Sequence, residues 1–438
     1  MSPPDPSEPR AFAAFRAPGF RPYLVTFFLT MMADNIEHVI SYWLMFQKFH
    51  SAALGGFAVV AHWVPFLVFS LPVGALNDRF DSRRLIQIGG ALFCFVSLAW
   101  GYLFLSDTLE MWHAMVLLVL HGCAGVFWST SSQMLLYDIV GPTALKSAVR
   151  LNATARYLGV LVGPGIGSLV MLTLGPTRGI LLNACFYLPL LLWLARAPYG
   201  RHFRAARVEP VDPLVTTPLD APSGHSISVP PPAPHQRAVR GLGDILQSLR
   251  DVRGIPAIGS MVALAGAASF FVGNSYQAQM PGFATHLGHG DPGIAYTSLL
   301  AADAAGALLG GLLLEVRSDR FGTTATSALK LGAIWGVALA GFALSHSYPL
   351  ALALLFLAGF FELSFNSVAQ TLVQLHAPDA ARGRVLGLYA MAASGLRTFS
   401  GITVGLAGSF TSIHTSLAVS AALFVGVCLA LFRFVKQA

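Results

Sequence analysis

The chain has 438 residues, of which 55% are hydrophobic and only 11% are charged, and its mean hydropathy is +0.64. Soluble proteins carry about 25% charged residues, so this composition excludes a single large water-soluble core. The formal charge of +7 comes from basic residues spread between apolar runs, a pattern that does not favour a nucleic-acid-binding patch.

Apolar runs of about 20 residues recur along the whole chain, and a helix of that length spans the hydrocarbon layer of a bilayer. In chain order the predicted spans lie near residues 22–46, 54–76, 85–106, 113–137, 149–174, 179–197, 256–281, 293–314, 324–345, 348–374, 385–408 and 412–434. These twelve spans predict an all-α membrane protein.

Polar segments divide the chain into parts. We expect an N-terminal tail (1–20), a bundle of six helices (21–197), a linker (198–254) and a second bundle of six helices (255–438). The linker contains VPPPAPHQR, which neither a packed helix nor a strand tolerates.

Basic residues lie mostly on one side of the predicted membrane. Lys and Arg gather in the two termini and in the even-numbered gaps between helices, whereas only Lys48 and Arg178 lie in odd-numbered gaps. Because basic segments next to membrane helices stay in the cytoplasm, this asymmetry predicts that both termini are cytoplasmic.

The two predicted bundles are weak repeats of each other. The letters NDRF at 77–80 recur as SDRF at 318–321, an offset of 241 residues. The same offset pairs isolated polar residues inside the helices: His62 with Asp303, His121 with Glu362, Gln133 with Gln374, and Arg156 with Arg397. We therefore predict two structurally equivalent halves, with a substrate cavity between them near the bilayer midplane.

The letters GALNDRFDSRRL, between the second and third predicted helices, resemble the loop motif of the major facilitator superfamily. Asp78, Arg79 and Arg83 match that motif, whereas Asp81 stands where the family has a glycine. Because part of this motif recurs in the second half of the chain, an ordinary basic loop is the less favoured interpretation.

This resemblance implies a gate. In it, Asp78 caps the cytoplasmic end of helix 11, because a helix N-terminus stabilises an acid. A basic neighbour in the loop pairs with an acid at the end of helix 4, for which Asp138 is placed.

A second motif, GVLVGPGIGS, resembles one found in the exporter branches of the same superfamily. Gly159, Gly163 and Gly167 lie four residues apart, so they share one helix face and permit close approach of another helix. Pro164 bends the helix. Such a seam can hinge and seal, although ordinary packing of small residues is the alternative.

The first predicted helix carries three titratable residues in an otherwise apolar run. Asp34, Glu37 and His38 have the spacing i, i+3, i+4 and so share one face. A carboxylate in lipid is costly, so these residues should face a cavity or a partner. The family resemblance puts helix 1 beside the central cavity with helices 4, 7 and 10. Our hypothesis is a proton site of these three residues and His121; a static buried ion pair is the alternative.

Other polar residues are candidates for the same cavity. We predict that substrate contacts Asn274 and Gln277 on helix 7, Glu362 and Asn366 on helix 10, and Arg397 on helix 11. His62 and Asp303 are predicted to meet between the halves and gate the cavity, with static packing as the alternative.

Together these features predict two pseudo-symmetric six-helix bundles of the major facilitator fold. Wider phrases resemble the drug and siderophore exporters that include the enterobactin exporter. The resemblance implies a monomer in a bacterial-type inner membrane that exports a small amphipathic molecule, siderophore-like or drug-like, by proton antiport and alternating access.

Several alternatives stay open. Uptake of a small organic solute is one, and export of a divalent metal is another, because Asp34 and His38 are four residues apart. A non-transporting sensor is a third. An enzyme acting on lipid is disfavoured, since the sequence has no clustered nucleophile with a base and no H-E-x-x-H. It also lacks G-x-x-x-x-G-K-[ST], so ATP is not expected to drive transport directly. No cofactor and no resident metal are expected.

Overall fold

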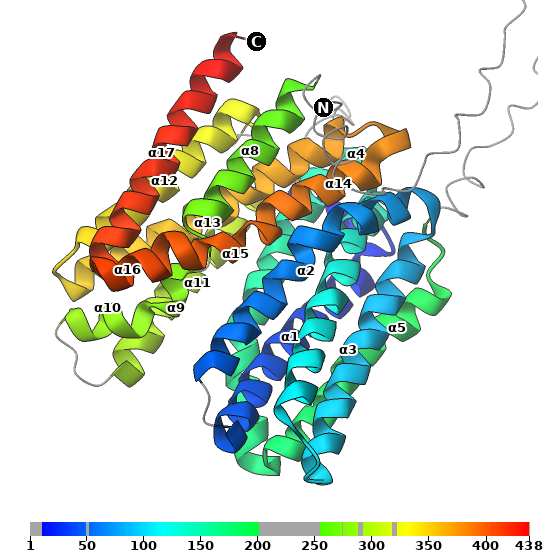
Figure 1. Ribbon diagram of the computed structural model, residues 1–438. Helices are drawn as coiled ribbons and strands as arrows, with labels where there is room; N and C mark the ends of the chain where they lie inside the picture. The colour runs from blue at the N-terminus through cyan, green and yellow to red at the C-terminus, as the bar shows by residue number, and fades with distance from the viewer. Residues whose placement is uncertain are drawn as a thin grey trace, which may run out of the picture.

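The computed structural model describes residues 11–49, 52–200, 255–273, 275–287, 292–317 and 322–437. Nearly all of these residues are helical, and no strand occurs among them. The helices of each half of the chain form their own bundle, and the two bundles lie side by side (Figure 1). Residues 201–254 of the predicted linker (198–254) lie outside the described residues.

The first bundle contains the five helices that precede the linker. They are α1 (Phe20–Phe49), α2 (Ala52–Arg79), α3 (Ser82–Leu105), α4 (Met111–Leu174) and α5 (Pro176–Arg196), after a short turn η1 (Ala13–Arg16).

Helix α4 comprises the fourth and fifth predicted spans, so the loop expected between them is a kink. The kink is at Gly141 (φ 68°, ψ −179°). A positive φ suits glycine, the residue before a proline avoids helical angles, and Pro142 is suited to the start of the next helix.

The second bundle begins with α8 (Pro256–Phe271), α9 (Ser275–Ala278), α10 (Met280–His286), α11 (Pro292–Val316), α12 (Ala325–Leu344) and α13 (Tyr348–His376). After a turn η2 (Asp379–Ala381) it ends with α14 (Arg382–Ala390), η3 (Met391–Gly395), α15 (Arg397–Ser400), η4 (Gly401–Leu406), α16 (Ala407–Phe410) and α17 (Ile413–Gln437). Two predicted spans are therefore irregular: helix 7 is divided into α8, α9 and α10, and helix 11 contains the π-helical turns η3 and η4.

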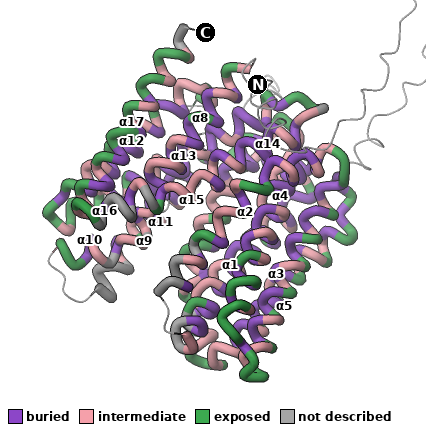
Figure 2. The backbone as a smooth tube through the Cα atoms, viewed as in Figure 1, coloured by how far each residue is buried: buried purple, intermediate pink, exposed green. Residues whose placement is uncertain are grey.

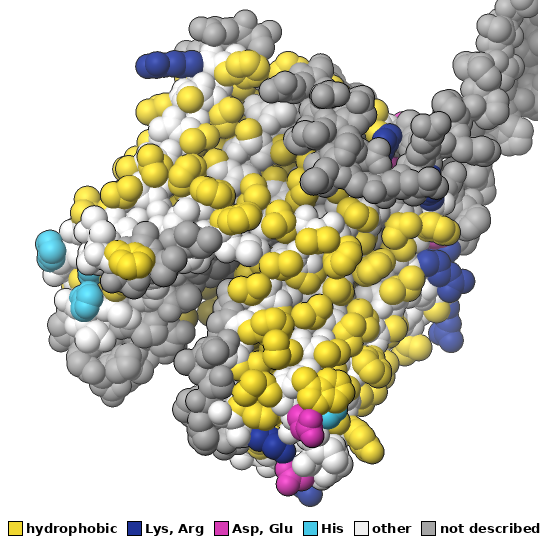
Figure 3. All heavy atoms as spheres, in the orientation of Figure 1, with side chains coloured by type: hydrophobic (Ala, Val, Ile, Leu, Met, Phe, Trp, Pro, Cys, Tyr) yellow, Lys and Arg dark blue, Asp and Glu magenta, His cyan; other side chains and the backbone are white. Residues whose placement is uncertain are grey.

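The outer surface suits a bilayer. Nine helices among the described residues are long and apolar enough to cross a membrane, and one of them is the double span α4. Large apolar side chains face outward, such as Leu172, which is 82% exposed. Hydrophobic side chains cover the middle of the visible face, and most visible Lys and Arg lie toward its edges (Figure 3).

Each half has its own apolar interior. One cluster of buried residues in the first half is centred on Tyr23, Phe93 and Tyr187, and the main cluster of the second half on Trp335, Phe365 and Phe424. Buried stretches of the chain run through the middle of both bundles (Figure 2). The halves meet where α2 packs on α14 and where α4 packs on α11 and α13. This arrangement leaves the space between the bundles available for a site.

Candidate functional site

A cavity lies between the two halves. It contains about 1170 Å³ of empty space, open solvent at its mouth included, and both halves contribute to its wall. Aromatic rings from the first half form much of the wall: Phe27, Trp63, Phe66, Phe93, Trp128 and Tyr157.

The polar groups of the cavity are few and unevenly charged. Asp34 is the only carboxylate that lines it among the described residues, and the cations Arg156 and Arg397 line it as well. The Arg397 guanidinium lies over the Trp63 ring, 5.0 Å from its centroid, and its Nε donates a hydrogen bond to the Ala393 carbonyl at 3.1 Å. Asn366 also lines the cavity, as predicted.

The predicted proton site is brought together in the first half. His121, on α4, lies between the two carboxylates of α1: its Nδ1 is 2.7 Å from Glu37 Oε1 and its Nε2 is 2.9 Å from Asp34 Oδ1. The Ser97 hydroxyl donates a hydrogen bond to the other oxygen of Glu37. Glu37 is only 2% exposed, so the chain Asp34–His121–Glu37 leads from the cavity into the dry interior.

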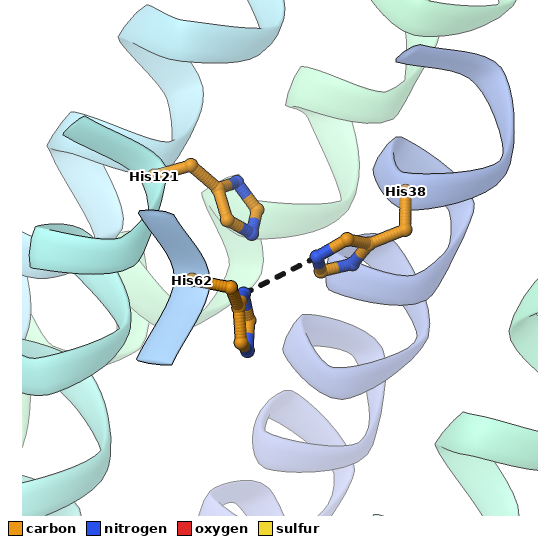
Figure 4. A group of neighbouring side chains, drawn as sticks. All are labelled: His38, His62 and His121. Carbon is orange, nitrogen blue, oxygen red and sulfur yellow. Dashed lines mark hydrogen bonds between the residues drawn. The ribbon is translucent and has the colours of Figure 1, made fainter. Parts of the chain in front are cut away.

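Two further histidines extend this network, and Figure 4 shows all three imidazoles converging from α1, α2 and α4. His38 Nδ1 is 2.7 Å from the Asp34 carbonyl oxygen, so this nitrogen carries the hydrogen. His38 Nε2 is then an acceptor, and it lies 3.3 Å from His62 Nδ1. One nitrogen from each ring lies within 4.8 Å of the other two.

His62 therefore belongs to the first-half network, and the predicted gating contact between His62 and Asp303 is not formed in this conformation. Asp303 Oδ2 instead lies 3.1 Å from the Tyr276 hydroxyl oxygen and accepts a hydrogen bond from Gln277 Nε2, also at 3.1 Å, both within its own half. The repeat put both residues at equivalent positions, and equivalent positions in two bundles need not touch.

Two predicted substrate ligands lie outside the cavity wall. Gln277 and Glu362 belong, with Asp303, to a buried cluster around the Tyr276 hydroxyl, which is 3.2 Å from Glu362 Oε2. Tyr276 was not predicted as a site residue, because a lone tyrosine in an apolar helix carries no signal beyond the polar residues beside it. Asn274 lies outside the described residues.

At the end of the molecule that carries both termini, the halves are joined as the loop motif implies. Asp78 Oδ1 and Oδ2 accept hydrogen bonds from the backbone amides of Gly383 at 2.6 Å and Arg384 at 3.1 Å. Those amides belong to the first turn of α14, where no carbonyl of the helix itself is available. The expected cap by Asp78 is thus present.

The basic residues of the loop have different surroundings. Arg83 binds Asp81, with Nη2 2.9 Å from Oδ2, and donates to the Ala197 carbonyl, so it fastens α3 to the end of α5 within one half. Asp81, which departs from the family pattern, also caps α3 by accepting from the Arg83 amide. Arg79 is exposed, and Asp138 is buried in α4.

A second contact between the halves was not predicted. Glu315, at the end of α11, is fully buried and accepts hydrogen bonds from the Ser147 hydroxyl and from the Phe12 amide, the latter at 2.6 Å. Arg150 donates to the Leu314 carbonyl beside it. A charged residue at the end of a span usually faces water, so the sequence held no sign of this burial.

The glycine seam is present on α4. A Cβ atom on Gly163 would lie 2.6 Å from the Asn35 Cβ and 2.9 Å from the Met32 carbonyl oxygen, both on α1. Gly159 and Gly167 also face α1, and Pro164 lies within the same helix. The seam therefore lets the helix that carries Asp34 approach α4 closely.

These features agree with comparisons to known proteins. The family model of the Major Facilitator Superfamily matches residues 23–394 and 262–438. The chain belongs to the major facilitator superfamily. As a member of that family it is a multi-pass membrane transporter of small molecules.

Curated relatives include the multidrug efflux pump Tap of two mycobacteria. The Mycobacterium tuberculosis H37Rv protein is 25% identical over 381 residues, which cover 84% of this chain and 82% of the relative. The Mycolicibacterium fortuitum protein is 26% identical over 405 residues, or 90% of each chain.

Solved structures share the fold. The Escherichia coli fucose:proton symporter FucP has a TM-score of 0.67 and 13% identity, covering 95% of this chain and 98% of its own. The human organic anion transporter TETRAN has a TM-score of 0.69 and 14% identity, covering 95% and 99%. The two-bundle architecture expected from the sequence is thus confirmed.

Proposed function

We propose that this transporter exports amphipathic organic molecules, which pack against the aromatic side chains of the cavity, in exchange for protons. The observation that carries the proposal is the position of Asp34: it lines the cavity and is bonded through His121 to the buried Glu37. One carboxylate is then accessible both to a substrate in the cavity and to a proton network behind it.

The cavity wall indicates the chemistry of the substrate. Trp63, Phe66 and Trp128 offer flat apolar faces, while Arg156 and Arg397 attract acidic or electron-rich groups. Drug-like molecules and aromatic siderophores both combine these properties. Export is the direction we favour, because the curated relatives are named as efflux pumps.

Coupling follows from competition at Asp34. When a proton joins the Asp34–His121–Glu37 network, its net charge rises by one, and the attraction of Asp34 for a cationic or hydrogen-bonding group falls. Histidine suits this role because its ordinary titration range lies near neutral pH. Substrate release and proton uptake thus favour each other, as antiport requires.

Alternating access requires the contacts at the terminus-bearing end to open. We place that end in the cytoplasm, on the positive-inside rule. Asp78 on the α14 amides and Glu315 on Ser147 then close the cytoplasmic side. In the inward-facing state both contacts separate, and Arg79, Arg83 and Asp138 lie at the opening. The seam of Gly159, Gly163, Pro164 and Gly167 lets α4 move against α1.

The test uses the purified full chain in sealed vesicles with an acidic interior. Ethidium and a fluorescent organic anion serve as probes, with protein-free vesicles as the control for passive partition. We expect protein-dependent accumulation inside, which Asp34→Asn abolishes. Asp107→Asn, a matched acid-to-amide change at a side chain that is 92% exposed, should leave it unchanged.

Other outcomes would redirect the proposal. Accumulation only when the exterior is acidic would indicate symport and uptake. Accumulation that Asp34→Asn leaves intact would remove Asp34 from the coupling. Movement of Co²⁺ with neither dye transported would favour a divalent metal as cargo.

A further inference from the structure

The second half contains a buried pair of acids that the proposed cycle has not yet used. The Tyr276 hydroxyl on α9 lies 3.1 Å from Asp303 Oδ2 on α11 and 3.2 Å from Glu362 Oε2 on α13. Tyr276 is fully buried, and the two acids are 3% and 7% exposed. Water is therefore not at hand to solvate two negative charges.

Counting hydrogens shows that this arrangement needs an additional proton. A tyrosine hydroxyl has one hydrogen and donates it to one acceptor only. Both carboxyl oxygens are within hydrogen-bond distance of the same hydroxyl oxygen, so the second acid can bond to it only as a donor. One of the two carboxyl groups must then be protonated.

The neighbours indicate which acid carries the proton. Glu362 interacts electrostatically with the cations Arg156 and Arg397, and a cation attracts a carboxylate more strongly than a neutral carboxyl group. Among the described residues no cation acts on Asp303 in this way. Its buried Oδ1 has no hydrogen-bond partner among the described residues, which is costly for a carboxylate oxygen and far less so for a neutral carboxyl group.

The full bonding pattern is then complete. Asp303 donates its proton from Oδ2 to the Tyr276 oxygen, and Tyr276 donates its own hydrogen to Glu362. Gln277 Nε2 donates hydrogen bonds to two oxygens of this cluster: the Tyr276 hydroxyl oxygen at 3.3 Å and Asp303 Oδ2 at 3.1 Å. Every hydrogen between the two acids has one donor and one acceptor.

We propose that Asp303, Tyr276 and Glu362 form a second proton-binding site of this transporter, in the half opposite the Asp34 network. The bound proton rests on the hydrogen-bonding geometry of these three residues alone and does not depend on the proposed direction of transport.

Infrared difference spectroscopy tests the bound proton without transport. In the purified full chain at neutral pH we expect the carbonyl stretch of a protonated carboxyl, shifted in D₂O. Asp303→Asn should remove this band. Asp34→Asn is the control from the other half, and it should leave the band in place. Tyr276→Phe keeps the shape of the ring and should shift the band, because the hydrogen bond from Asp303 is lost.

A band that survives both Asp303→Asn and Glu362→Gln would overturn the proposal. Tyr276→Phe keeps the test decisive where the other variants do not fold, since a band that it leaves unshifted would also contradict the site.

Discussion

The two halves share a topology and differ in how their equivalent helices are built. In the first half α1 runs unbroken for 30 residues against the glycine seam of α4. With the offset of 241 residues, Gly159 and Gly163 correspond to Ser400 and Val404 in the second half. The helix that faces them there is interrupted, with α8 ending at Phe271.

The difference shows what the seam accomplishes. Where glycines leave room, a continuous helix approaches closely and carries its acids to His121. Where side chains fill that space, the facing helix is divided, and the Ser275 and Ser400 hydroxyls meet at 2.8 Å instead. The first half thus presents its titratable network to the cavity, and the second half encloses its acid pair.

The largest expected effect is a difference in stability between a variant of the Asp34–His121–Glu37 network and a variant of the Asp303–Tyr276–Glu362 site. Glu37→Gln removes the buried carboxyl oxygen that bonds to His121 and should lower the free energy of unfolding by roughly 3 kcal/mol. Asp303→Asn replaces a neutral carboxyl by a neutral amide and should cost about 1 kcal/mol or less. Thermal unfolding of both variants in detergent measures the difference, and equal losses would contradict the contrast between the halves.

The contact that joins the halves should have the next largest effect. Asp78→Ala leaves two α14 amides without their acceptor, and the closed state should lose roughly 2 kcal/mol, or about 30-fold in population. Spin-label distances across the terminus-bearing end report that population. Asp81→Ala is the matched control, because Asp81 caps α3 within one half. A similar shift with Asp81→Ala would mean that general loosening, not the gate, moves the halves.

The seam itself is tested by making the first half resemble the second. Gly163→Ala forces α1 away from α4 and should cost roughly 1–3 kcal/mol, as overpacking does. It should also weaken dye transport, because Asp34 moves relative to His121. Gly165→Ala, two residues along the same helix, has no atom within 4 Å of the added Cβ and should have little effect. Equal stability of the two variants would argue against close approach at the seam.

Contacts between residues close together in the sequence were predictable, and contacts between residues far apart in the sequence were not predictable without further information. Asp34, Glu37 and His38 were predictable because helical spacing alone puts them on one face. Their convergence with His121 required the family resemblance. The partner of His62 was not predictable, because it depends on the rotation of α2 about its axis, which a repeat offset does not encode.

Contacts between distant helices were the least predictable. Tyr276 lies between acids that are 27 and 86 residues away in sequence, and nothing in an apolar stretch marks one aromatic ring as a bridge. Glu315 follows the same rule, since its partner Ser147 is 168 residues away. The sequence therefore predicts which residues are polar in the membrane, and packing decides which of them meet.

The smallest effect is expected at an ion pair that neither half encloses. Lys48 Nζ lies 2.6 Å from Asp107 Oδ1, and the Lys48 ammonium lowers the pKa of the Asp107 carboxyl below its usual value. A lowered pKa contributes stability above the usual pKa of aspartate and loses it as the pH falls through the lowered value. Asp107 is 92% exposed, however, and water and salt screen such pairs.

Asp107→Asn should therefore leave the melting temperature unchanged at pH 7 and pH 5, whereas Glu37→Gln lowers it at pH 7. A clear loss with Asp107→Asn would show that charge pairs stabilise this protein even in solvent, and burial would then no longer explain why the enclosed networks differ from the rest.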